Sequence, residues 1–315
     1  MKRFQNKVAE SSLSLPVSSV ISVLIWFAAG LVSRNLWVPL LLTGFTTYLI
    51  AEMNNRNALL RIRSRMMSCV YLFLTTMQTT VVSSWQLSAV QTITVLCVFL
   101  LLFCYKDRGM VSNIFCISIL LSAGSIMWVP LLYCLPVIVA LLCIPLYAMS
   151  IKAISAVVMG LILPYWSLVP YFIYVGNTNW LSSHFTPLYD GSVFFNYTSV
   201  TVGQAVYFGF LILLLLIGWI HFVRTSYKDK LKTRTLYDVF ITLAVFFAVI
   251  TLIVPAHADF TLSMLSIAVT PIAAHYFSLT NTKLTNAVFV IALVLVVAAS
   301  LFAIATPYFE MLILR

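Results

Sequence analysis

The chain has 315 residues, of which 62% are hydrophobic and only 8% are charged, and its mean hydropathy is +1.06. Soluble domains carry about 25% charged residues, so this composition excludes a soluble globular protein and predicts a polytopic membrane protein in contact with the lipid bilayer. The net charge of +10 would suggest nucleic acid as the partner of a soluble chain. Because no phosphate-binding glycine loop is present, we expect no nucleic-acid partner and no cofactor.

The first sixteen residues, MKRFQNKVAESSLSLP, are basic and then polar before the first apolar run begins. A cleaved signal peptide is the alternative to a membrane span here. The run from Val17 to Val32 is followed at once by SRNLW and a second apolar stretch. This pattern favours a retained first span with the N-terminus in the cytoplasm.

Apolar runs separated by polar breaks predict about eleven membrane spans. A span needs about 20 mostly apolar residues, and the long continuous runs are typical of helices rather than of barrel strands. We therefore expect an all-α polytopic bundle in which residues 1–315 form a single transmembrane helical domain. The predicted spans are approximately 17–33, 36–52, 67–84, 87–105, 111–128, 130–149, 153–175, 202–223, 236–254, 260–279 and 285–305.

The distribution of positive charge tests this span count. With the N-terminus in the cytoplasm, sixteen of the eighteen Lys and Arg residues fall in cytoplasmic segments, and only Arg34 and Arg315 fall outside. Positive residues concentrate on the cytoplasmic side of membrane proteins, so the charge pattern favours eleven spans with the C-terminus outside. The predicted location is the inner (plasma) membrane of the cell, with multiple passes.

The six cysteines indicate neither a metal centre nor a disulfide framework. They lie in or beside apolar runs, with no CxxC pair and no histidine at metal-ligand spacing. We expect them to be small packing residues, and we predict no metal site. Their positions are 69, 97, 104, 116, 134 and 143.

Two loops and one aromatic span suggest contacts with lipid. The basic loop 224–238 is expected to set topology and to bind anionic lipid headgroups. The outer loop 176–203 carries His184 and Asp190 and could lie as a cap over a cavity. The span before it contains Pro164 and Pro170, and its Tyr165, Trp166 and Tyr171 could line a groove for a lipid or a sugar. The alternative for these aromatic residues is an interfacial belt.

His257 and Asp259 are the candidate catalytic residues, because they lie two residues apart at the outer start of a helix. A histidine and a carboxylate can share a proton or bind a polar headgroup, although Asp259 could equally be a helix-capping residue. His275 is about 24 Å away along the same helix, so we expect it to meet headgroups at the inner end. Glu52, His221 and Asp238 lie at the inner ends of their spans and are expected to be solvated or ion-paired boundary residues.

Several segments resemble an uncharacterised family of polytopic inner-membrane proteins of Bacteroidota. These segments are SIKAISAVVMGLILPYWSLVPYFIYVG at 150–176, HADFTLSMLSIAVTPIAAHYFS at 257–278 and NNRNALL at 54–60. More distantly, the layout is similar to membrane glycosyltransferases and glycan polymerases that use lipid-linked donors. Those enzymes place an acidic residue in the first external loop, where this chain has Ser33-Arg34-Asn35, so Asp190 or Asp259 would have to replace it.

Three functions remain open at this point. The first is an enzyme or a binding protein for an envelope glycolipid, or lipid-linked glycan, at the outer face. The second is a non-catalytic assembly or scaffold protein that binds partners through a polar helix face such as TTMQTTVVSS at 75–84. The third is a transporter or flippase, which is disfavoured because ionisable residues at mid-membrane are nearly absent.

Overall fold

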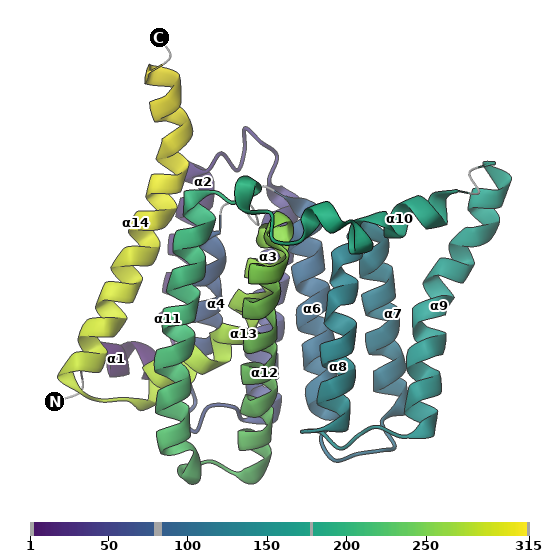
Figure 1. The fold of residues 1–315 in the computed structure, drawn as a ribbon. Coiled ribbons are helices and arrows are strands. Elements are labelled where there is room, and N and C mark those ends of the chain that lie inside the picture. Colours follow the sequence, from purple (N-terminus) through teal and green to yellow (C-terminus); the bar gives the residue numbers. More distant parts are fainter. Residues whose placement is uncertain (1–2, 79–83, 177–178, 314–315) are drawn as a thin grey trace.

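The computed structural model describes residues 3–78, 84–176 and 179–313, with side chains as far as residue 301 except at residue 181. The described residues form an all-α bundle (Figure 1), which confirms that the fold is all-α, as the sequence predicts. The thirteen α-helices of this part of the chain are α1 (Phe4–Glu10), α2 (Ser14–Ala28), α3 (Trp37–Asn57), α4 (Met66–Met77), α6 (Trp85–Phe103), α7 (Val111–Met127), α8 (Cys134–Cys143), α9 (Ile151–Tyr174), α10 (Trp180–Tyr189), α11 (Val202–Thr225), α12 (Leu231–Ile253), α13 (Ala258–Leu279) and α14 (Lys283–Ile313).

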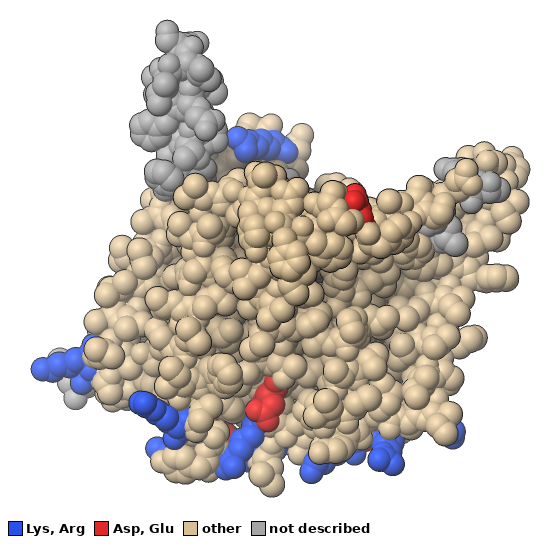
Figure 2. Space-filling view, viewed as in Figure 1, with Lys and Arg blue, Asp and Glu red and all other residues tan. Residues whose placement is uncertain are grey.

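The two ends of the bundle differ in charge. The loops that join α8 to α9, α11 to α12 and α13 to α14 lie at the lower end in Figure 1, and α10 lies across the upper end. In Figure 2 the Lys and Arg side chains gather along the lower edge of the molecule. We call this the basic end and the opposite side the outer end.

Helix α13 is the centre of the bundle. It packs against α12, α11 and α4, and nearly all of its residues are buried. Many of its polar residues are small, and several of their hydroxyls bond to the helix itself: Ser266 Oγ donates to Ser263 O and Thr270 Oγ1 to Ser266 O, both at 2.7 Å. Small residues with internally satisfied hydroxyls allow neighbouring helices to approach closely within a membrane.

One such close approach occurs at a glycine of α11. A Cβ atom at Gly218 of α11 would lie 2.7 Å from Ile272 Cγ2 and 3.0 Å from the Ile272 carbonyl oxygen of α13. The backbones of α11 and α13 therefore meet at this point. Gly160 of α9 plays the same part against α7, where an added Cβ would lie 2.9 Å from the Phe115 carbonyl oxygen.

Six helical segments of the described residues are long and apolar enough to cross a membrane, or seven if the bent α1–α2 pair counts as one span. All eleven predicted runs fall on helices, but several of these helices are short. Helices α4, α7 and α8 have 12, 17 and 10 residues. Helix α3 has 21 residues but ends in the polar sequence AEMNNRN. The chain is thus a multi-pass helical membrane protein.

The polar face predicted for partner binding at 75–84 lies partly outside the described residues, which omit 79–83. Its described part is buried within the bundle. Thr75 and Thr76 bond to the backbone of their own helix, and Gln78 Nε2 donates to the Asp259 backbone oxygen at 2.7 Å. These three side chains pack inside the protein rather than facing a partner.

Candidate functional site

A shallow pocket opens at the outer end, between α7, α10 and the 3-10 turn η5 (Pro255–His257). Its volume is about 370 Å³. The indole of Trp128 packs against Phe260 of α13, with ring centroids 5.8 Å apart. His257 is the ionisable residue among the described residues that line the pocket. The lining consists of Gln86, Met127, Trp128, Val129, Pro130, Pro187 and His257.

His257 and Asp259, the two predicted catalytic residues, face different surroundings. His257 borders the pocket, and its Nε2 is buried without a hydrogen-bond partner among the described residues. Asp259 Oδ1 accepts a hydrogen bond of 2.7 Å from Gln204 Nε2 of α11. Asp259 therefore links α13 to α11, while His257 borders the pocket with a buried, unpaired Nε2.

Helix α10 is held over the outer end by a hydrogen-bonded group that includes Tyr165 and His184. Ser125 Oγ and Tyr165 OH lie 2.6 Å apart, and His184 Nε2 lies 3.1 Å from the Ser125 carbonyl oxygen and 3.4 Å from Tyr165 OH. Burial lowers the pKa of His184, against the opposing effect of its bond to Ser125, so the imidazole is neutral at pH 7. The structure thus brings two predicted binding residues together.

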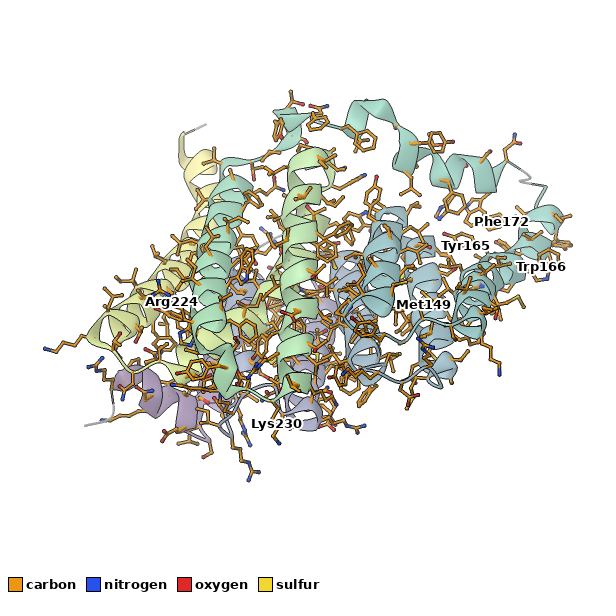
Figure 3. All side chains as sticks on the ribbon, turned by 60° about the horizontal axis from the view of Figure 1, so that its bottom comes forward. Met149, Tyr165, Trp166, Phe172, Arg224 and Lys230 are labelled. Atoms are coloured by element: carbon orange, nitrogen blue, oxygen red, sulfur yellow. The ribbon has the colours of Figure 1, made fainter. Side chains whose placement is uncertain are left out.

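Aromatic rings extend this group along α10. Trp180 stacks on Phe172 of α9 with centroids 4.0 Å apart and on His184 with centroids 4.8 Å apart. Tyr165 lies 5.2 Å from the ring of Phe185. In Figure 3, Tyr165 and Phe172 lie beneath the segment that crosses the outer end. We call Tyr165, Phe172, Trp180, His184 and Phe185 the aromatic wall.

The other predicted binding residues lie apart from this wall. Trp166, labelled in Figure 3, is 73% exposed on α9, and Tyr171 of the same helix is 60% exposed. Asp190 is exposed and accepts a hydrogen bond of 3.0 Å from the Ser192 amide. That bond lowers the pKa of the Asp190 carboxyl. It also stabilises the turn that packs against η5, so Asp190 shapes the loop beside His257.

The outer loop is tied to the end of α12. Tyr197 OH donates to the Leu252 carbonyl oxygen at 2.7 Å, and the Phe195 amide donates to the Ile253 carbonyl oxygen at 2.9 Å. These bonds hold the described part of the loop over η5. The expectation that this loop lies as a cap at the outer end agrees with its course in Figure 1.

A second cluster of ionisable residues lies at the basic end, around Asp229. Arg61, in the α3–α4 loop, donates to both carboxylate oxygens of Asp229, from Nε to Oδ1 and from Nη2 to Oδ2 at 2.9 Å. Arg61 Nη2 also donates to the Thr225 carbonyl oxygen at 2.9 Å, and Arg234 Nε donates to the Asp229 carbonyl oxygen at 3.0 Å. A bidentate Arg–carboxylate pair fixes orientation as well as charge, so it joins the α3–α4 and α11–α12 loops.

Asp229 is ionised in this cluster. Its side chain is only 1% exposed, while that of Arg61 is 28% exposed. Burial alone would raise the pKa of the Asp229 carboxyl, but the hydrogen bonds and charge of Arg61 outweigh it, and the pKa lies below its ordinary value of 3.8. The cluster is therefore a charged pair with one member inside the protein.

His275 belongs to this cluster, and the expectation that it meets lipid headgroups is wrong. Its side chain is 0% exposed, its Nε2 lies 3.4 Å from Asp229 Oδ2, and its ring lies 4.9 Å from that of Tyr237. The α11–α12 loop folds over the end of α13 and brings Asp229 against it, which excludes headgroups. His221 lies beside it, with ring centroids 5.5 Å apart.

The other inner boundary residues behave largely as predicted. Glu52 pairs with Arg56 at 2.5 Å on the surface of α3, and Asp238 is exposed on α12. The sequence argument missed Arg61 and Asp229. The available signal was an acidic residue in the middle of the most basic loop, since Asp229 is surrounded by Lys228, Lys230 and Lys232.

Comparison with protein-family models, with curated proteins and with solved structures found no match. The class of protein therefore follows from the fold: a multi-pass helical membrane protein with a pocket at its outer end and a buried ionic cluster at its basic end.

Proposed function

We propose that the chain crosses the plasma membrane eleven times, with the basic end in the cytoplasm. Successive helices from α2 to α14, apart from α10 at the outer end, connect the two ends in turn (Figure 1). The gathering of Lys and Arg along the lower edge supports this orientation (Figure 2), because positive residues concentrate on the cytoplasmic side. Short helices such as α8 span only where neighbouring protein or a thinned bilayer shields their ends. The resemblance to inner-membrane proteins of Bacteroidota agrees with this location.

Cysteine labelling tests the proposed orientation. We expect Ser199→Cys, in the outer loop, to react in intact cells with a membrane-impermeant maleimide, and Tyr227→Cys, in the basic loop, to react only after permeabilisation. Both positions are exposed. Cys116 and Cys143, the two exposed native cysteines, are replaced by Ser in both variants to remove background labelling. The reverse pattern of labelling would refute the orientation.

We infer that the outer pocket binds the polar headgroup of a lipid-linked glycan. The observation that carries this proposal is the meeting of Trp128, Gln86 and His257 around one open pocket beside the membrane surface. An aromatic face with a few polar side chains is the usual lining of a small-molecule site. Trp128 offers a face for a sugar ring, and Gln86 and His257 offer hydrogen bonds to its hydroxyls.

The aromatic wall supports the same ligand. It lies on the bilayer side of α10, where the apolar chain of a lipid-linked molecule has to run. Since Tyr165 and His184 already bond to each other and to Ser125, they position α10 and shape the site rather than act on the ligand. Trp166 and Tyr171 on the exposed face of α9 are then available to the lipid chain.

If the protein is an enzyme, His257 is the group that meets the substrate and Asp259 is a positioning residue. The imidazole has a free buried Nε2, whereas the Asp259 carboxylate accepts from Gln204 and anchors the start of α13. A neutral histidine at this place could take a proton from a sugar hydroxyl as a general base. A loss of turnover without a loss of binding in His257→Gln would identify such a role.

Binding of a polyprenyl-pyrophosphate-linked disaccharide to the purified protein tests the proposal. We expect Trp128→Ala to weaken binding on the order of tenfold, because the variant removes the aromatic face and about 1–2 kcal/mol of ring contact. We expect His257→Ala to weaken it by a smaller factor, corresponding to the loss of about 1 kcal/mol for one hydrogen bond.

Trp166→Ala is the matched control, since it removes an indole of the same size from the exposed face of α9. The affinity of this variant for the glycolipid should remain within about twofold of the wild-type value, because substitutions at exposed positions away from the site have small effects. Equal losses in Trp128→Ala and Trp166→Ala would contradict the pocket as the headgroup site. No measurable binding by the wild-type protein would favour the scaffold function instead.

A further inference from the structure

The N-terminal helix α1 is clamped across the basic end of the bundle. The side-chain Nε2 of Gln5 donates to the Phe277 carbonyl oxygen at 2.5 Å and to Thr280 Oγ1 at 2.8 Å. The backbone N–H of Gln5 donates to Asn286 Oδ1 at 3.0 Å. Helix α1 meets α2 at an angle of 100°. The link Ser11–Leu13 between them is therefore a sharp corner at the basic end of the bundle.

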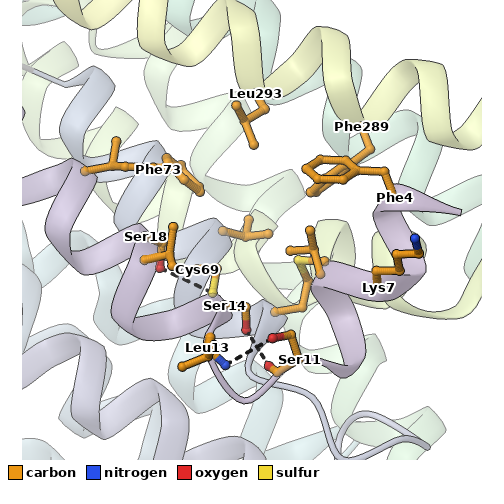
Figure 4. Close-up of a pocket in the computed structure, with 15 residues that line it drawn as sticks. Phe4, Lys7, Ser11, Leu13, Ser14, Ser18, Cys69, Phe73, Phe289 and Leu293 are labelled. Atoms are coloured by element: carbon orange, nitrogen blue, oxygen red, sulfur yellow. Dashed lines mark hydrogen bonds between the residues drawn. The ribbon is translucent and has the colours of Figure 1, made fainter.

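An apolar groove opens on one side of this corner, between α1, α2, α4 and α14. Its volume is about 480 Å³. Figure 4 shows Phe73, Phe289 and Leu293 on one side, Ser11, Leu13 and Ser14 facing them, and Lys7 at the edge. Val17 and Ile21 of α2 extend the lining along the span. The groove is therefore apolar along its length and has an ammonium group at the end nearest the basic face.

A polar pocket of about 540 Å³ lies on the other side of the same corner. Ser11 lines both cavities, and α4 contributes to each, with Met66 and Cys69 lining the groove and Met67 and Ser68 lining the pocket. The lining of the polar pocket includes Glu10, Arg63 and Arg65.

The two arginines give this pocket its character. Arg65 Nη1 donates to the Ser12 carbonyl oxygen at 3.2 Å, which holds its guanidinium against the corner. Arg63 is exposed and forms no ion pair with the described residues. With Lys7, three cations lie around the corner against the carboxylate of Glu10, so the site as a whole favours an anion.

We propose that an anionic phospholipid binds at the α1–α2 corner, with an acyl chain in the apolar groove and its phosphate at Arg63 and Arg65. Guanidinium groups bind phosphate oxygens through paired, charge-assisted hydrogen bonds. The groove opens sideways between spans, where acyl chains are the surrounding solvent. Charge selects the lipid class, because a zwitterionic headgroup brings a cation of its own toward Arg63 and Arg65.

Native mass spectrometry of the full-length protein, with phosphatidylglycerol or phosphatidylcholine of matched chains, tests this site. We expect the wild-type protein to retain phosphatidylglycerol on the order of tenfold more strongly than phosphatidylcholine. Each basic residue near a lipid surface contributes about 1 kcal/mol of attraction to an anionic headgroup. The double variant Arg63→Gln/Arg65→Gln should lose this preference. Arg56→Gln, a change of the same kind at an arginine paired with Glu52 on the same end, should keep it.

Two further measurements separate the lipid from other ligands. Ile21→Trp fills the groove and should lower the occupancy of both lipids, whereas an excess of inorganic phosphate should leave the bound phosphatidylglycerol in place. Equal retention of the two lipids by the wild-type protein would overturn the proposal, and so would displacement by phosphate alone. Thermal unfolding of each variant shows whether it is folded, and the wild-type comparison is decisive even where a variant is not.

Discussion

Asp229→Ala is expected to lower the free energy of unfolding by about 2–4 kcal/mol, measured by thermal or denaturant unfolding in detergent. Removing one member of a buried ion pair leaves the other charge uncompensated, which is costly. The loss falls short of the largest values for such pairs, because the Arg61 side chain is 28% exposed and regains some water. The variant also removes the acceptor that His275 and Arg61 share.

Asp238→Ala is the matched control, because Asp238 is an exposed acid at the same end of α12. Its effect should stay within about 0.5 kcal/mol, as is usual for surface substitutions. If the two variants lose the same stability, the Asp229 cluster does not hold the loops together.

The Asp229 cluster should also make the stability of the protein depend on pH. The pKa of Asp229 is lower in the folded protein than its ordinary value of 3.8, so its stabilising contribution is complete above about pH 4 and is lost as the pH falls toward the folded pKa. The stability difference between the wild-type protein and Asp229→Asn should therefore narrow below about pH 4. A difference that stays constant from pH 7 to pH 3 would contradict this account.

Gly218→Leu is expected to disrupt the packing of α11 on α13 and to cost about 3 kcal/mol or more, since overpacking at a backbone contact cannot be relieved by a side-chain rotation. Even a single added Cβ would lie 3.0 Å from the Ile272 carbonyl oxygen. The measurement is the midpoint of thermal unfolding together with the yield of folded protein in the membrane.

Gly209→Leu, on the same helix, is the control. Apart from its own helix, nothing lies within 4 Å of a Cβ placed at Gly209, so leucine meets open space and also has the higher helix propensity. We expect Gly209→Leu to be neutral or slightly stabilising. If Gly218→Leu and Gly209→Leu lose similar stability, the contact between α11 and α13 is not the cause of the loss.

The helices themselves were predictable from composition and hydropathy. Apolar runs of membrane length are read directly from a chain, and each predicted run falls on a helix. The lengths of the helices were harder to predict from the sequence, because an apolar run does not reveal where a helix ends. The run predicted at 67–84 contains helix α4, which ends at Met77, and the run at 130–149 contains a 3-10 turn before α8.

The sites were predictable only in part, for reasons of distance along the chain. Arg61 and Asp229 are 168 residues apart in sequence, and nothing local indicates that they pair. His275 shows the same limit, since its burial depends on a loop 46 residues away. His257 and Asp259 are only two residues apart in sequence, yet the Asp259 carboxylate accepts a hydrogen bond from Gln204 of α11 while the His257 imidazole borders the pocket.

The two ends of the molecule are proposed to bind different molecules: a lipid-linked glycan at the outer pocket and an anionic phospholipid at the α1–α2 corner. The outer pocket is shallow and carries aromatic and amide side chains. The corner combines an apolar groove with arginines. A negative result for one proposed site does not affect the proposal for the other, because the two sites lie at opposite ends of the bundle (Figure 1).

The most direct test of the outer site is photo-crosslinking of the purified protein with a polyprenyl-pyrophosphate-linked disaccharide that carries a photoactivatable group on the sugar. The cross-linked peptides are then identified by mass spectrometry. We predict that the label falls on the peptides that contain Trp128, Pro187 and His257, and that unlabelled glycolipid competes for it. Label confined to the peptides around Arg63 and Arg65, or spread evenly over exposed helices, would contradict a glycan site at the outer end.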